Sequence, residues 1–123
     1  MSGGSDEAAE RFFDGHPDAL EAYRTVRAIL DGFGPVEVRV TKSQVAFRHR
    51  KAFAWLWLPG RWLQDPGAEV VLSVALGRSD RSPRFKEIVN PAPNVWMHHL
   101  EVHTLEDLDA EVAGWLVRAY ERA

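Results

Sequence analysis

Apolar residues recur at intervals of three and four along residues 20–33, and beyond residue 35 they begin to alternate with polar ones. The first spacing places them on one face of a helix, which Pro17 would begin and Gly34 and Pro35 would end. A second helical pattern follows Thr104, a candidate N-cap. The apolar face of this second helix comprises Leu105, Leu108, Val112, Trp115, Leu116 and Ala119.

Five segments between these helices either alternate between apolar and polar residues or are apolar throughout, as β-strands are. They cover residues 36–41, 44–50, 53–58, 69–76 and 95–104. The third is apolar on both faces, which predicts a central strand. Short connections favour antiparallel neighbours. The sequence therefore predicts an α+β fold, in which a five-stranded, mainly antiparallel sheet carries the N- and C-terminal helices on one face.

A chain of 123 residues is typical of a single domain. We expect residues 16–123 to form this α+β domain and residues 1–15 to be a flexible N-terminal arm with a short helix at residues 6–13. Phe12 and Phe13 would anchor the arm. The sequence shows neither a signal peptide nor the run of about 20 apolar residues that a membrane helix needs. We therefore expect a cytoplasmic protein with no membrane contact.

Composition and charge argue against several classes of function. The net charge of −3 disfavours binding to nucleic acids, which select basic surfaces. The absence of cysteine excludes disulfides, thiolate metal sites and cysteine nucleophiles. The chain also lacks a nucleophile elbow, a phosphate-binding loop and a dinucleotide fingerprint. We accordingly expect no cofactor.

Residues 95–104 contain three of the five histidines and one carboxylate. Strand alternation places His99, Glu101 and His103 on one face, which Met97 shares, with same-face neighbours roughly 7 Å apart. The opposite face, directed to the core, comprises Trp96, His98, Leu100 and Val102. The first set forms a polar stripe across the sheet, whereas His98 is expected to be a packed core histidine.

The sheet face opposite the helices would combine cationic, aromatic and small side chains. This combination suits a small anionic or aromatic ligand, with Ala46, Ser73 and Ala75 leaving room for it. The expected ligand-binding residues are Arg39, Lys42, Arg48, Trp55, Lys86, His99, Glu101 and His103. The predicted function is a non-catalytic binding module for a small molecule, although the same residues would also suit a solvated sheet face without a ligand.

The stripe of His99, Glu101 and His103 leaves an enzymatic alternative open. A histidine beside a carboxylate can transfer protons in a small hydrolase, and both side chains can ligate a metal ion. No further residue completes a ligand set, so no metal is expected. A third alternative is a protein-interaction module or homodimer that pairs through exposed aromatic residues such as Trp57 or Trp62.

Residues 77–94 form the longest connection that the pattern leaves irregular. Such connections are usually functional or mobile. One interpretation is a hinged lid that brings Lys86 and Arg84 to an anion near His99. The other is a fixed loop whose Phe85 fills the edge of the core.

Five runs of sequence together resemble a known family: F-F-D-G-H-P-D-A-L, V-T-K-S-Q-V-A-F-R, F-A-W-L-W-L-P-G, S-P-R-F-K-E-I-V and W-M-H-H-L-E-V. The family comprises small bacterial domains of unknown function, common in actinobacteria, which occur alone or appended to longer uncharacterised proteins. The resemblance extends from Phe12 to Tyr120. It implies a free-standing bacterial cytoplasmic domain with this order of helices and strands, and it implies no reaction.

Overall fold

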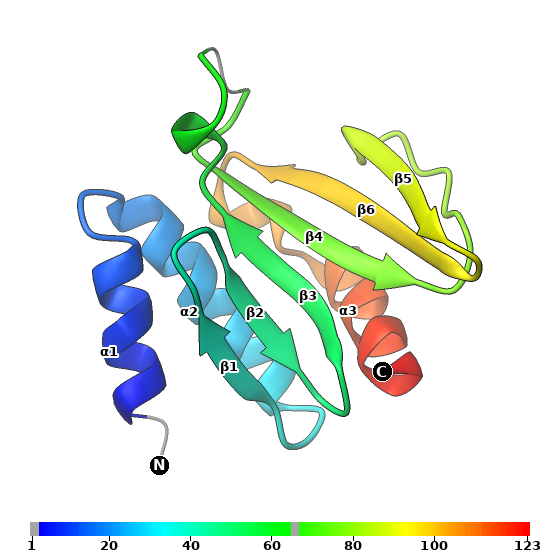
Figure 1. Cartoon of the computed structure of the whole chain (residues 1–123), viewed down its shortest axis with the longest axis horizontal. Helices are drawn as coiled ribbons and strands as arrows, with labels where there is room; N and C mark the ends of the chain where they lie inside the picture. Colours follow the sequence, from blue (N-terminus) through cyan, green and yellow to red (C-terminus); the bar gives the residue numbers. More distant parts are fainter. Residues whose placement is uncertain (1–2, 65–66) are drawn as a thin grey trace.

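The computed structural model describes residues 3–64 and 67–123, so the first two residues of the expected flexible arm lie outside the described part (Figure 1). The helices in this part are α1 (Gly3–Phe12), α2 (Pro17–Asp31) and α3 (Ala110–Arg122). The strands are β1 (Glu37–Val40), β2 (Val45–Arg48), β3 (Ala52–Trp57), β4 (Val70–Leu76), β5 (Glu87–Ala92) and β6 (Val95–Val102). Two short 3-10 turns, η1 (Pro59–Arg61) and η2 (Leu105–Asp107), lie in the connections.

The strands form one sheet in the order β1-β2-β3-β4-β6-β5, and every neighbouring pair is antiparallel. The predicted number of five strands was wrong, because β5 lies within the connection that the pattern left irregular. Its residues are exposed except for the half-buried Ile88, so no alternation of apolar residues marks it. Pro91 lies within the strand, and proline is tolerated there because β5 is at the edge of the sheet.

The helices leave one face of the sheet uncovered. In Figure 1, α2 and α3 lie behind the sheet, and α1 lies beside the edge strand β1. The main core fills the space between sheet and helices, where Leu30, Leu56, Leu72 and Leu116 are fully buried. The predicted placement of the two long helices on one face is therefore what the structure shows.

The two terminal segments differ in detail from the predicted helices. The first helix covers Gly3–Phe12 rather than residues 6–13, and Phe13, directly after it, is buried, as the anchoring of the arm requires. At the other end, Leu105 was wrongly assigned to the apolar face of the final helix, because it lies in η2 and is 46% exposed. The helix α3 begins later, after Asp109, whose carboxylate accepts a hydrogen bond from the backbone N–H of Val112 at 3.2 Å.

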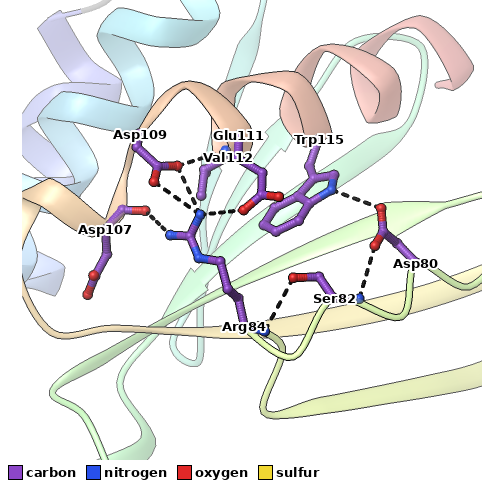
Figure 2. Close-up of polar contacts among 8 residues, drawn as sticks. All are labelled: Asp80, Ser82, Arg84, Asp107, Asp109, Glu111, Val112 and Trp115. Atoms are coloured by element: carbon purple, nitrogen blue, oxygen red, sulfur yellow. Dashed lines mark hydrogen bonds and ion pairs between the residues drawn. The ribbon is translucent and has the colours of Figure 1, made fainter.

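Residues 80–86 are fastened to α3 by polar contacts (Figure 2). The Arg84 guanidinium donates to the carboxylates of Asp109 at 3.0 Å and Glu111 at 2.8 Å, and to the backbone oxygen of Asp107 at 2.8 Å. Phe85 is 8% exposed, and its ring centroid lies 4.3 Å from that of Trp115. These contacts favour the fixed-loop interpretation of this connection.

Candidate functional site

One row of side chains crosses the open face of the sheet. The strand register places Trp55 of β3 opposite Ser73 of β4, and Ser73 opposite His99 of β6. Each of them alternates with residues that are buried against the helices, such as Leu56 and Leu72. The row therefore faces away from the helices, as the alternation predicted for this face.

This row forms the floor of a groove with a volume of about 450 Å³. Its lining residues are Ser43, Gln44, Trp55, Trp57, Trp62, Ser73, Met97 and His99. Trp62 comes from the connection that follows β3 and is 62% exposed, whereas the other two tryptophans project from β3 itself. The lining contains no carboxylate, lysine or arginine, so three indole rings and a thioether dominate its surface.

Two larger depressions on the described surface have different linings. One of about 660 Å³, where α1 meets α2, is open and is lined largely by charged side chains such as Glu7, Glu10 and Arg11. The other, of about 500 Å³, has three carboxylates in its lining, those of Asp18, Glu21 and Glu69. Neither combines aromatic walls with a few convergent polar groups, the usual mark of a small-molecule site. We therefore take the tryptophan groove as the candidate site.

A chain of hydrogen bonds runs along the floor of the groove. The indole N–H of Trp57 donates to Ser73 Oγ at 2.9 Å, and Ser73 Oγ lies 2.7 Å from His99 Nδ1. The Trp57 and His99 rings meet edge to face, with centroids 6.0 Å apart. Because Ser73 is only 3% exposed, these two bonds satisfy a hydroxyl that is almost sealed from water.

Burial lowers the pKa of His99 below its usual value of 6.5. The carboxylate of Glu87, which lies opposite His99 on β5, acts in the other direction, and the neighbouring His98 and Lys86 add to the lowering. His99 is therefore neutral at pH 7. The floor of the groove then carries no formal charge.

Glu101 is the centre of a separate ionic cluster. Lys86 Nζ lies 3.4 Å from Glu101 Oε2, and His103 Nε2 lies 3.7 Å from Oε1. The backbone at Gly67 covers the carboxylate so closely that a Cβ there would be 2.1 Å from Oε2. Glu101 is thus held by Lys86, by His103 and by the end of the connection after β3, and it does not line the groove.

The structure brings only two of the predicted ligand-binding residues into the groove, Trp55 and His99. On the outer strands, Arg39 and Arg48 share the carboxylate of Glu37, with N–O distances of 3.4 and 3.3 Å. The two arginines thus share one carboxylate, and neither of them lines the groove. Their separation from His99 follows from the strand order, which no residue pattern specifies.

The remaining predicted residue, Lys42, is exposed in the turn before β2 and next to the lining residue Ser43. Sequence reasoning treated Ser73 as a small residue that leaves room, and it missed Met97 as a lining residue. The sequence did indicate the position of both residues, because alternation along the strands places them on the same face of the sheet as Trp55 and His99. No such signal exists for Trp62, which lies outside the strands.

The structure also bears on metal binding and on membrane-spanning helices, both of which were considered from the sequence. Within residues 3–64 and 67–123, no three or more histidine, aspartate or glutamate side chains are arranged to hold a metal ion. The helices in the same residues are all too short or too polar to cross a membrane.

Comparison with known proteins gives a family for the chain. A family model described as a domain of unknown function, DUF5655, matches residues 9–123. The chain belongs to this family. The match confirms a family of unknown function over nearly the whole chain, as the resemblance indicated. No curated protein matches the sequence, and no solved structure matches the fold.

Proposed function

We propose that the protein binds a small, flat, uncharged aromatic molecule in the tryptophan groove. The observation that carries this proposal is the lining itself: Trp55, Trp57 and Trp62 line one groove together with the hydrogen-bonded pair of Ser73 and His99. Aromatic walls supply apolar contact and ring stacking, while a few polar groups orient a ligand. The volume of about 450 Å³ is within the range of small-molecule sites.

The charges around the groove favour a neutral ligand over the anionic one that the sequence also allowed. Lys86 pairs with Glu101, and Arg39 pairs with Glu37. An anion would compete with these carboxylates for the cations and would gain less from them than from unpaired charges. A neutral ring would leave both pairs intact.

Isothermal titration calorimetry at pH 7.5 can test the proposal with one ring in three charge states: 2-naphthol, 2-naphthoate and 2-naphthylmethylammonium. We expect 2-naphthol to bind most tightly. Tighter binding of naphthoate would overturn the preference for a neutral ligand. No binding by any of the three would overturn the proposed site.

A matched pair of variants locates the binding. Trp62→Ala should weaken 2-naphthol binding about 10-fold, because stacking on one aromatic side chain contributes about 1–3 kcal/mol. Leu63→Ala is the control, since Leu63 is 45% exposed and does not line the groove. Equal effects of the two substitutions would contradict the assignment. If Trp62→Ala instead dissociates a dimer in light scattering, the homodimer alternative is favoured.

The Ser73–His99 pair supports a second candidate function, hydrolysis of an aromatic ester. His99 Nδ1 would take the hydroxyl proton while Oγ attacks the acyl carbon, the alcohol would leave with that proton, and water would release the acid. Turnover of 2-naphthyl acetate that Ser73→Ala abolishes would support it. Equal rates for the two proteins would exclude it. The strand pairing on both sides of Ser73 argues against it, because backbone amides engaged in the sheet cannot stabilise an oxyanion.

A further inference from the structure

We infer that His99 presents a fixed hydrogen-bond donor, Nε2–H, to the groove, and that the ligand is therefore an aromatic ring carrying a hydrogen-bond acceptor. A ring nitrogen or a carbonyl oxygen attached to the ring would serve. This inference rests on the proposed function and adds to it the chemical class of the ligand.

The direction of the hydrogen bonds follows from Trp57. An indole N–H can only donate, so Trp57 occupies one lone pair of Ser73 Oγ. The hydroxyl hydrogen of Ser73 must then find an acceptor inside the protein, because the residue is 3% exposed. His99 Nδ1, at 2.7 Å, is placed to accept it. Ser73 thus donates to His99.

This direction decides which ring nitrogen of His99 carries the proton. A neutral imidazole that accepts at Nδ1 is protonated at Nε2. Within the described residues, His99 Nε2 has no hydrogen-bond partner. It is also not buried, because the buried side-chain polar atom without a partner in these residues is Glu101 Oε2 and not His99 Nε2. Nε2–H therefore remains open to a ligand in the groove that His99 lines.

The doubly protonated form of His99 is disfavoured by the same geometry. Both Trp57 and His99 would then donate to Ser73 Oγ, and the serine hydrogen would lose its acceptor. The surrounding groups act in both directions: Glu87 favours the charged form, whereas Lys86, His98 and burial oppose it. The net lowering of the His99 pKa agrees with a neutral ring that acts as a donor through Nε2 only.

Two bicyclic rings of similar size separate acceptor from donor chemistry: isoquinoline offers a ring nitrogen, and indole offers an N–H. Their affinities for the wild-type protein and for His99→Leu are measured by calorimetry at pH 8, where both rings are neutral. We expect His99→Leu to lower the ratio of isoquinoline to indole affinity about 3- to 10-fold, the contribution of one hydrogen bond. His103→Leu is the control, because His103 directly follows β6 and does not line the groove.

The outcomes distinguish the two proposals. If neither ring binds the wild-type protein, the proposed function fails. If both bind and His99→Leu leaves the ratio unchanged or raises it, only the donor assignment fails. Nitrogen-15 NMR of the ligand-free protein gives an independent result even if His99→Leu does not fold. We expect His99 protonated at Nε2 alone, and protonation at Nδ1 would overturn the inference.

Discussion

Two connections of this protein are held very differently. Residues 80–86 are joined to α3 by Arg84, and their Phe85 is buried between two rings. Residues 61–63 are held at one end, where Arg61 donates to the backbone oxygens of Lys42 and Phe12 at 2.9 and 3.0 Å. The two residues that follow Arg61 expose large apolar side chains. The connection between β4 and β5 is thus the structural one, and the connection between β3 and β4 supplies a wall of the candidate site.

Hydrogen exchange should show the largest difference between the two connections. The amide of Lys86 bonds to the backbone oxygen of His99 at 2.8 Å and joins the sheet, so it should exchange at a rate close to that of the core. The amide of Leu63 bonds within a single turn, to Pro59, and should exchange more than about 100-fold faster. Binding of 2-naphthol should slow Leu63 but not Lys86. Fast exchange at Lys86 would restore the lid interpretation.

Substituting one tryptophan in each region should give very different losses of stability. Trp115 is 4% exposed and packs against Phe85, so Trp115→Ala should lower the free energy of unfolding by about 3–5 kcal/mol. Trp62→Ala should change it by less than about 0.5 kcal/mol, as is usual on the surface. Urea denaturation measures both. A loss below about 1 kcal/mol for Trp115→Ala would contradict its place in the core.

The polar contacts of Arg84 should contribute less to the free energy of unfolding than the packing of Trp115 does. Arg84→Met removes hydrogen bonds to Asp109 and Glu111 and should cost about 1–2 kcal/mol, because each charged bond is partly solvated. Arg81→Met is the matched control. Arg81 is exposed and makes no hydrogen bond or ion pair within the described residues. Equal losses for the two variants would mean that the Arg84 contacts do not stabilise the fold.

Much of the fold could be predicted because alternation records burial. His98 is fully buried while His99 lies on the open face, as the parity of their strand required. The same reasoning failed for β5, because an edge strand buries little, and nothing in its pattern separates it from a loop. Its partner β6 could be predicted because Leu100 and Val102 are apolar residues at alternating positions, and both are buried in the structure.

Only part of the candidate site could be predicted, because alternation along a strand shows on which face of the sheet a side chain lies but not which side chains are its neighbours. Arg48 was placed on the correct face, yet it pairs with Glu37, a contact set by the register of β1 and β2. Trp62 has no periodic signal, since the path of its loop depends on how Arg61 and Gly67 are anchored elsewhere. The ligand-binding role of the groove stays a proposal.

Acid should affect the groove residue His99 and the Arg84–Asp109 contact in different pH ranges, with the smallest effects of this set. His99 has a folded-state pKa below 6.5, so the unfolded chain binds more protons and stability falls as the pH drops below about 6.5. Hydrogen bonding by Arg84 lowers the pKa of Asp109, so that its contribution is present above about pH 4 and is lost as the pH falls through its folded-state pKa.

Thermal melts at pH 7.5, 5.5 and 3.5 can separate these contributions. His99→Leu should reduce the loss of stability between pH 7.5 and 5.5, and Asp109→Asn should reduce the loss between pH 5.5 and 3.5. The reverse assignment, or no change in either range, would show that other groups dominate the acid response.

The most direct test of the groove uses the five tryptophans as reporters. Their indole N–H signals are resolved in a nitrogen-15 correlation NMR spectrum, and 2-naphthol is added in steps. The groove assignment predicts shifts for Trp55, Trp57 and Trp62, with Trp96 and Trp115 unchanged because they lie outside the lining. Shifts confined to Trp96 and Trp115, or no shift at saturating 2-naphthol, would contradict it.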